Sequence, residues 1–237
     1  GWSDWQALMF TMELGDQGND ARGIGTYLFG QGPNGAGIRP APYSTNFAVN
    51  NYTYNNRTGV AVPHGIGFLW ATMLWEMNWN LIDRYGFNPD IYDATALDDG
   101  NILAYQLVND GMAIQPCSPG FEDGRDAILA ADEALTDGEN YCDIWNAFAI
   151  RGMGYSADQG SSTSVSDGQA AFDVPPACRG TVVSPDEVNI CVGTNGVYNV
   201  VVSEPFTQTV TLTGSGNPAP STLSFAPPSA TPPFTSV

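Results

Sequence analysis

The most strongly patterned stretch of the chain runs from residue 60 to residue 86. Its apolar side chains recur at spacings of three and four residues, the pattern of a largely buried helix; they are Phe68, Leu69, Met73, Leu74, Trp75, Leu81 and Ile82. Pro63 suits the entry to a helix and Gly86 suits its end. We therefore predict one long helix that begins near His64, the single histidine of the chain.

Shorter stretches with helical spacing occur on both sides of this helix. Residues 1–13 place five apolar side chains on one face, namely Trp2, Trp5, Leu8, Met9 and Met12. Further helices are predicted at about 101–114, 122–135 and 141–150, separated by an acidic segment and by the breaker PCSPG. We therefore expect residues 1–155 to form a mainly helical domain.

The pattern changes after residue 155. Residues 156–177 are rich in Ser, Gly and Asp and carry few packing side chains, which predicts a linker. After Cys178, apolar residues alternate with a period of two in VNICV, VYNVVV, QTVTLT and TLSFA. Such segments are fewer than the roughly seven strands of an immunoglobulin-like unit. We predict that residues 178–237 form a small, incomplete antiparallel β-sandwich.

The charge balance narrows the range of partners. The chain has 25 acidic and 7 basic residues and a net charge of −18. Nucleic acid is an improbable partner, because phosphate neutralisation needs a basic surface, and the same argument disfavours an anionic membrane. No apolar run reaches the roughly 20 residues of a membrane span. We therefore expect no nucleic-acid partner and no membrane span.

The four cysteines are even in number, and none lies in a CxxC pair. A zinc knuckle is therefore not expected. The economical arrangement is two local disulfides, Cys117–Cys142 and Cys178–Cys191, each stabilising the fold by roughly 2–4 kcal/mol. Disulfides indicate an oxidising environment, so we expect a secreted, extracellular protein.

A long irregular segment, residues 14–58, is rich in Gly, Asn, Pro and Tyr. Such segments in compact domains are usually functional or held by ligands. The acidic runs at 16–20 and 90–99 could bind calcium through carboxylate and carbonyl oxygens. Neither run has the spacing of a known calcium loop, so solvated acidic loops are the favoured alternative.

Hydrolytic chemistry cannot be completed from the residues of this chain alone. No GxSxG motif is present, and the cysteines are better used in disulfides, which disfavours a serine or cysteine hydrolase. A catalytic zinc site usually takes three protein ligands, often including two histidines. His64 on its own can be either a packed structural residue or a general acid, base or oxyanion partner, and the pattern leaves both readings open.

Several separate motifs occur in one order over residues 1–155: GWSDW, GIRPAPYSTNFAVNNYTY, PHGIGFLWATMLWEM, AIQPCSPGFEDGRDAILAADEAL and CDIWNAFAIRGMG. In this combination the chain resembles the C-terminal half of a fungalysin-type zinc metalloendopeptidase, a family distantly related to thermolysin. Cys117 and Cys142 match a cysteine pair of that family. NICVGTNGVYNVVV and FTQTVTLTGSGNPA resemble accessory β-sandwich modules of secreted bacterial proteases.

The resemblance also implies where zinc is bound. In that family a HExxH helix supplies two histidine ligands and the general base, and the glutamate of a pattern like E-G-W-S-D supplies the third ligand. This chain begins at the glycine of that pattern. The resemblance therefore implies that the zinc ligands lie upstream of Gly1, that the upstream half of the protease is a partner, and that this chain alone is inactive.

Three residues of this chain match functional positions of the family. His64 matches the histidine that steadies the oxyanion of the tetrahedral intermediate, and Arg39 matches an arginine that contacts a substrate carbonyl. Asp4 matches the aspartate that accepts a hydrogen bond from a zinc-bound histidine and so orients it. Family members often have an acidic residue shortly before the histidine, whereas residues 60–63 are apolar here. The partner that orients His64 is therefore unassigned.

Two functions are compatible with these observations. The first is part of a secreted zinc endopeptidase, which hydrolyses peptide bonds with a metal-activated water. The alternative is a catalytically inactive structural or assembly module that keeps a protease-like fold. Its incomplete β-region would then pair strand edges with other chains.

Overall fold

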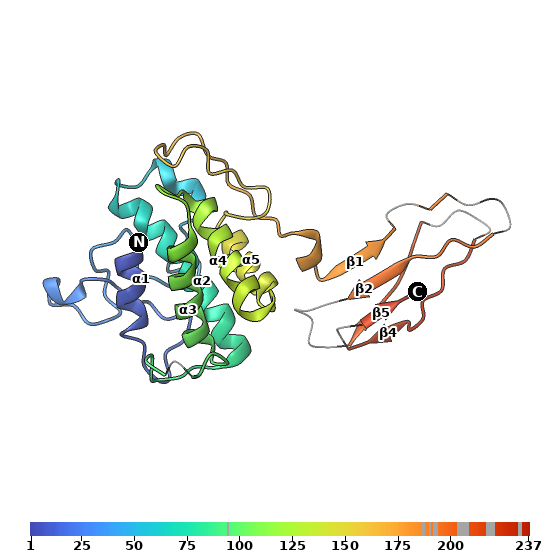
Figure 1. Cartoon of the computed structure of the whole chain (residues 1–237), viewed down its shortest axis with the longest axis horizontal. Coiled ribbons are helices and arrows are strands. Elements are labelled where there is room, and N and C mark those ends of the chain that lie inside the picture. The colour runs from blue at the N-terminus through green and yellow to red at the C-terminus, as the bar shows by residue number, and fades with distance from the viewer. Residues whose placement is uncertain are drawn as a thin grey trace. The chain divides into compact units, whose positions relative to one another are not determined.

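The computed structural model describes residues 1–93, 95–185, 188–189, 191, 194–202, 209–216, 221–231 and 234–237. Two compact units divide the chain, Gly1–Val174 and Pro175–Val237. The first unit contains helices and long irregular segments, and the second contains short strands (Figure 1). A mainly helical domain followed by a small antiparallel β-region is the fold class that the sequence predicts, and it is confirmed.

The helices of the first unit lie where the hydrophobic pattern predicts them. They are α1 (Trp2–Met9), α2 (His64–Tyr85), α3 (Gly100–Ile114), α4 (Phe121–Thr136) and α5 (Tyr141–Ile150), with the 3₁₀ helices η1 (Thr26–Phe29) and η2 (Tyr54–Thr58). The first helix is shorter than predicted, although Met12 beyond its end is still buried. None of the helices in the described residues is long and apolar enough to cross a bilayer.

The long helix α2 forms the centre of the helical unit. It packs against α1, α3, α5 and η2, and α4 packs against α3 and α5 (Figure 1). Most of its side chains are buried, as the spacing of its apolar residues predicts. Among the largest buried aromatic side chains of the core, Trp5, Phe68, Trp75 and Phe148 come from three helices and Tyr43 comes from the irregular segment before α2. These contacts hold the N-terminal turn of α2 in a defined position.

The irregular segment before α2 is held by a buried arginine. Arg151 follows α5 and has a fully buried side chain. Its guanidinium donates hydrogen bonds to the carbonyl oxygens of Ser44 at 2.8 Å, Asn50 at 2.6 Å and Tyr52 at 3.1 Å. The sequence suggests that such a segment is functional or held by ligands, and in the structure a protein side chain holds part of it.

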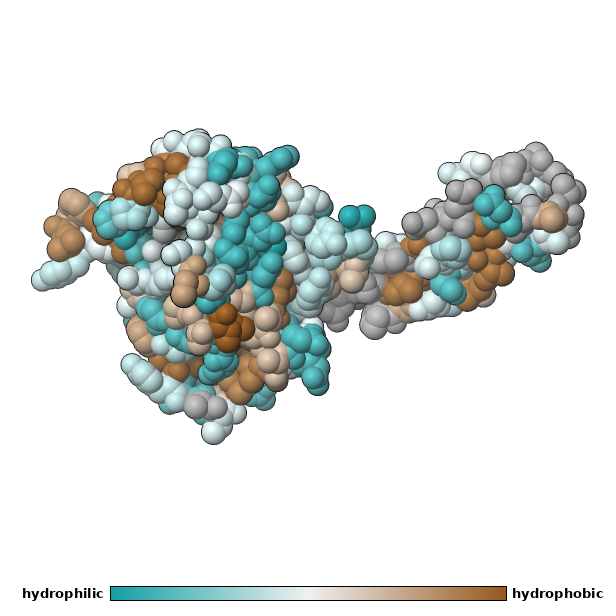
Figure 2. Space-filling view, turned by 45° about the horizontal axis from the view of Figure 1, so that its top comes forward, coloured by the Kyte–Doolittle hydropathy of each residue, from teal (hydrophilic) through white to brown (hydrophobic). Residues whose placement is uncertain are grey.

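An apolar tip projects from the same irregular segment. Tyr27, Leu28 and Phe29 on η1 are 92%, 75% and 62% exposed. Gly25 and Gly30 flank η1 with φ of 70° and 64°, a left-handed conformation that favours glycine. Figure 2 shows apolar surface on the segment that projects at the left of the helical unit. The tip therefore presents large apolar side chains to solvent.

Residues 156–174 pack on the helical unit, which differs from the predicted free linker. Asp158 forms an antiparallel bridge with Gln169, and Met153 a parallel bridge with Ala171. Ala157 is buried in the core. The segment packs through backbone hydrogen bonds and small side chains, so its Ser- and Gly-rich composition does not reveal the contact. The packing of residues 156–174 does not bear on residues 178–237, and a separate module there stays a prediction.

The disulfide arrangement also differs from the prediction. Cys142 and Cys178 are disulfide-bonded, whereas Cys117 and Cys191 are exposed free thiols. The predicted pairs Cys117–Cys142 and Cys178–Cys191 are therefore wrong, including the pair taken from the family resemblance. A disulfide requires Cα atoms within about 7 Å and suitable Cβ directions. Short separation along the chain does not supply that geometry.

The second unit contains two small antiparallel sheets in its described residues. After η3 (Pro176–Cys178), β1 (Thr181–Ser184), β2 (Asn199–Val202) and β5 (Phe234–Ser236) pair in the order β1-β2-β5, and β3 (Val210–Thr211) pairs with β4 (Ser229–Ala230). Val201 lies opposite Val182 and Thr235. The alternating pattern predicts β2 and β3 correctly. Residues 222–226 form no strand, and neither do residues 188, 189 and 191 of the predicted strand at 188–192; residues 190 and 192 lie outside the described residues.

Candidate functional site

The first turn of α1 carries a buried carboxylate with three hydrogen-bond donors. Asp4 is 4% exposed. Arg39 donates from Nε to Oδ2 at 2.6 Å and from Nη2 to Oδ1 at 2.7 Å. The hydroxyl of the fully buried Tyr43 donates to Oδ2 at 2.6 Å. The structure thus joins Asp4 and Arg39, two of the predicted site residues, in one bidentate ion pair.

These contacts determine the charge state of the cluster. Burial by itself would raise the pKa of Asp4, but the hydrogen bonds from Arg39 and Tyr43 outweigh burial and lower that pKa. The hydrogen bond to Asp4 raises the pKa of Arg39. Burial, together with the neighbouring carboxylate, raises the pKa of Tyr43. At neutral pH the cluster therefore holds an ionised carboxylate, a guanidinium cation and a neutral phenol.

The carboxylate of Asp4 has room for one more hydrogen bond. An ionised carboxylate offers about four acceptor positions, two on each oxygen. Arg39 and Tyr43 occupy both positions on Oδ2, and Arg39 occupies one on Oδ1. The remaining position on Oδ1 can accept a hydrogen bond from a group outside the cluster.

His64, the third predicted site residue, begins α2 and has an exposed side chain. Within the described part of the chain its imidazole has no hydrogen-bond or ion-pair partner. The structure therefore does not support the interpretation of His64 as a packed structural residue. The apolar residues before it supply no orienting carboxylate, in agreement with the sequence.

The N-terminal turns of α1 and α2 lie side by side. The rings of Trp2 and Trp70 meet edge to face, with 5.2 Å between their centroids. A Cβ atom on Gly67 would lie 2.3 Å from the backbone nitrogen of Gly1, so only glycine permits this approach. The turn that carries His64 is thereby placed next to the turn that carries Asp4.

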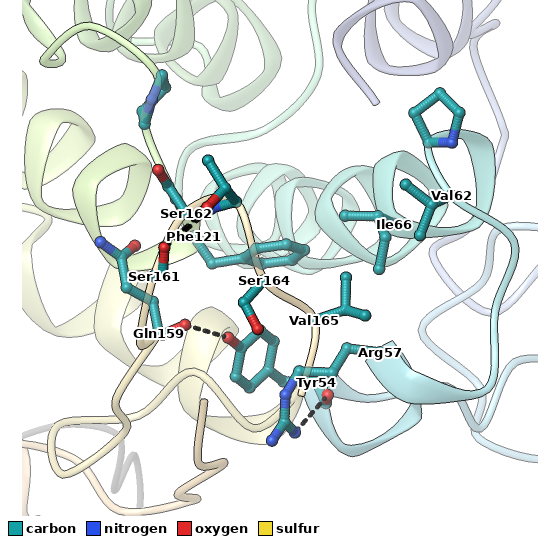
Figure 3. Close-up of a pocket in the computed structure, with 14 residues that line it drawn as sticks. Tyr54, Arg57, Val62, Ile66, Phe121, Gln159, Ser161, Ser162, Ser164 and Val165 are labelled. Atoms are coloured by element: carbon teal, nitrogen blue, oxygen red, sulfur yellow. Dashed lines mark hydrogen bonds between the residues drawn. The ribbon is translucent and has the colours of Figure 1, made fainter. Parts of the chain in front are cut away.

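A pocket of about 190 Å³ opens beside the start of α2. Val62 and Ile66 line it from the N-terminal turn of α2 and the residues before it, and Phe121 lines it from α4 (Figure 3). Residues 161–165 close another side, although the sequence predicts them to be a linker. Nothing in the spacing of these residues predicts the pocket, because it is formed by segments about 100 positions apart.

The acidic stretches considered for calcium use their carboxylates to close turns. Asp90 accepts the backbone N–H of Tyr92 at 3.1 Å, and Asp16 is paired with Arg22. In the described residues no group of three or more His, Cys, Asp or Glu side chains could hold a metal ion. The structure therefore lends no support to the calcium prediction.

A family model and the similar proteins point to the same protein family. The model of the family "Fungalysin metallopeptidase (M36)" matches residues 1–157. The chain is 44% identical over 169 residues to "Extracellular metalloproteinase mep" of Aspergillus fumigatus, covering 70% of this chain and 26% of that protein. It is 42% identical over 183 residues to "Extracellular metalloproteinase 9" of Coccidioides posadasii, covering 76% and 27%. The chain thus spans about a quarter of the length of these curated relatives.

Proposed function

The chain belongs to the fungalysin metallopeptidase family, and from this premise we propose that it forms part of the catalytic domain of a secreted zinc endopeptidase. The relatives named as extracellular metalloproteinases support both the peptide-hydrolysing activity and the extracellular location. We further propose that residues 178–237 are a separate module that follows the catalytic part.

The described residues of this chain do not form a zinc site by themselves. His64 is the only histidine, and the described residues contain no cluster of three candidate ligands. We therefore propose that the upstream half of the protease supplies the zinc ligands.

The ion pair of Asp4 and Arg39 is the observation that carries the proposal. Asp4 keeps one acceptor position on Oδ1, which suits the role of orienting a histidine that another part of the protease supplies. Arg39 is held by two bonds to Asp4, so its remaining N–H groups have a defined direction. In this role Arg39 donates to the carbonyl oxygen of a bound peptide.

His64 is suited to stabilise negative charge on a reacting oxygen. Its imidazole is exposed at the N-terminal turn of α2, beside the turn that carries Asp4. An N–H donor that meets a developing oxyanion typically contributes about 2.7–4 kcal/mol to the transition state. The exposure of His64 supports this role, since a donor must reach the substrate.

A chimaera with a relative tests the proposal. This chain would replace the matching segment of the Aspergillus fumigatus metalloproteinase, and kcat/KM on a peptide substrate would be measured with and without His64→Ala. We expect a decrease of about 100- to 1,000-fold with zinc content unchanged. Arg84→Ala, at the opposite end of α2, is the matched control and should leave kcat/KM within about twofold.

Two results would speak against the proposal. Unchanged kcat/KM in His64→Ala would remove the assigned role of His64. A chimaera that binds one zinc ion, folds and lacks all peptidase activity would instead favour the alternative of a structural module with a protease-like fold.

A further inference from the structure

The pocket beside α2 has mainly apolar walls. Ile66, Phe121 and Val165 face its interior, and Val62 lies at its edge (Figure 3). Its volume of about 190 Å³ is below the roughly 300–1,000 Å³ of sites for drug-sized ligands. The pocket is therefore of a size to hold a single apolar side chain.

The walls of the pocket are held in place by contacts between distant segments. The hydroxyl of Tyr54 donates to the carbonyl oxygen of Gln159 at 3.2 Å, and the rings of Tyr54 and Phe121 are 5.0 Å apart. The backbone N–H of Tyr54 donates to the carbonyl oxygen of Arg151 at 2.8 Å. A preformed pocket reduces the entropy cost of binding, because few side chains must be ordered.

Arg57 places a positive charge at this pocket. Every other arginine of the helical unit has a carboxylate within ion-pair distance; these pairs are Arg22–Asp16, Arg39–Asp4, Arg84–Asp143, Arg125–Asp126 and Arg151–Glu76. Among the described residues Arg57 has none, and its buried Nε has no hydrogen-bond partner. The net charge of the chain is −18. Arg57 therefore differs from the other arginines of the helical unit in lacking a carboxylate at ion-pair distance among the described residues.

Two backbone carbonyl oxygens and an aromatic ring position the guanidinium of Arg57. Nη1 donates to the carbonyl oxygen of Tyr54 at 3.3 Å, and Nη2 donates to that of Gly168. The guanidinium also stacks over the ring of Tyr54, 4.7 Å from its centroid. Asp167 lies on the same loop; its carboxylate accepts the backbone N–H of Ser161 at 3.1 Å and interacts electrostatically with Arg57 from beyond ion-pair distance. Among the described residues, therefore, no carboxylate lies within ion-pair distance of this guanidinium.

We propose that this pocket binds the C-terminal residue of a peptide. The apolar side chain of that residue would lie between Ile66, Phe121 and Val165, and its α-carboxylate would meet the guanidinium of Arg57. A free C-terminus presents an apolar side chain and a carboxylate on the same residue, which matches an apolar pocket with one cation. The proposal rests on the pocket and not on the peptidase activity, so either can fail alone.

Titration of the 237-residue chain with small probes, followed by NMR, tests the proposal. The probes are N-acetyl-L-leucine, its C-terminal amide N-acetyl-L-leucinamide, and N-acetylglycine. We expect the acid to bind about tenfold more tightly than the amide, because a charge-assisted hydrogen bond is lost in the amide. N-acetylglycine, which lacks the apolar side chain, should bind at least about tenfold more weakly than N-acetyl-L-leucine.

Variants assign the effect to Arg57. Arg57→Gln should reduce the affinity for the acid to that for the amide, Arg57→Lys should retain part of the difference, and Arg84→Gln, with the same charge change, should not alter it. Equal affinities for acid and amide in the unaltered chain would overturn the proposal, as would no binding at about 100 mM probe. If Arg57→Gln does not fold, the affinities of the acid and the amide for the unaltered chain and for Arg57→Lys still test the proposal.

Discussion

Arg151 and Glu76 form an ion pair in the interior of the helical unit, with 2.5 Å between Nη2 and Oε1. Burial lowers the pKa of Arg151 and raises that of Glu76, and the attraction between the two charges opposes both shifts. The same guanidinium binds three backbone carbonyl oxygens of the segment before η2. The pair therefore connects α2 to the irregular segment that includes Tyr43 and Arg39.

Arg151→Met should destabilise the chain by about 3–5 kcal/mol, because it leaves the Glu76 carboxylate and several carbonyl oxygens buried without donors. Urea unfolding followed by circular dichroism measures the loss. Arg84→Met is the control, since Arg84 pairs with Asp143 near the surface and should cost at most about 1 kcal/mol. Equal losses in the two variants would contradict the structural role of Arg151.

Gln159 provides the N-terminal cap of α4 from a distant segment. Its Oε1 accepts the backbone N–H groups of Glu122 at 2.7 Å and Asp123 at 3.2 Å. Gln159→Ala should therefore cost about 0.5–2 kcal/mol and speed hydrogen exchange of those two amides. Gln169→Ala, on the same segment with an exposed side chain, should change neither quantity. Unaltered exchange at Glu122 and Asp123 in Gln159→Ala would show that the cap is not formed.

This cap and the Asp4–Arg39 pair are contacts that the spacing of apolar residues cannot predict. The spacing of apolar residues predicts α2 and α5 almost to the residue, because each helix buries one continuous apolar face. The cap of Gln159 depends on a contact between segments 36 or 37 positions apart. Such a contact leaves no local pattern in the sequence, and a Ser- and Gly-rich composition conceals it.

In the candidate site, too, some features follow from the sequence and others only from the structure. The family motifs name Asp4, Arg39 and His64 individually, yet the bond between Asp4 and Arg39 joins residues 35 positions apart and becomes visible only in the structure. The pairing of cysteines is a further case, since chain separation gives no information on Cα distance. The motifs therefore nominate individual residues, whereas contacts between distant segments become visible only in the structure.

The cysteines can be assigned by counting thiols. The native chain should react with a thiol reagent at Cys117 and Cys191 without prior reduction, because both are exposed free thiols. Cys142 and Cys178 should react only after reduction in denaturant. Cys117→Ser should lower the native count by one. A native chain without reactive thiols would contradict this arrangement.

The Asp4 cluster should give the stability of the chain a specific dependence on pH. Asp4 has a lowered pKa in the folded chain, below the ordinary value of about 3.9 that it regains on unfolding. In the window between these pKa values the unfolded chain binds more protons, so stability rises with pH there. The contribution of Asp4 is complete above that window and is lost as pH falls through the folded pKa.

Asp4→Asn isolates this contribution. The contributions of the other titrating groups cancel when the free energy of unfolding of the variant is subtracted from that of the unaltered chain. At neutral pH the variant should be about 1.5–3 kcal/mol less stable than the unaltered chain, since a charged hydrogen-bond acceptor is lost. The difference should stay constant down to about pH 5 and narrow below about pH 4. Tyr43→Phe removes one donor to Asp4, so the folded pKa of Asp4 should rise, and the narrowing should be smaller and end at a higher pH. A difference that stays constant from about pH 6 to pH 2 in urea unfolding would mean that folding does not change the pKa of Asp4.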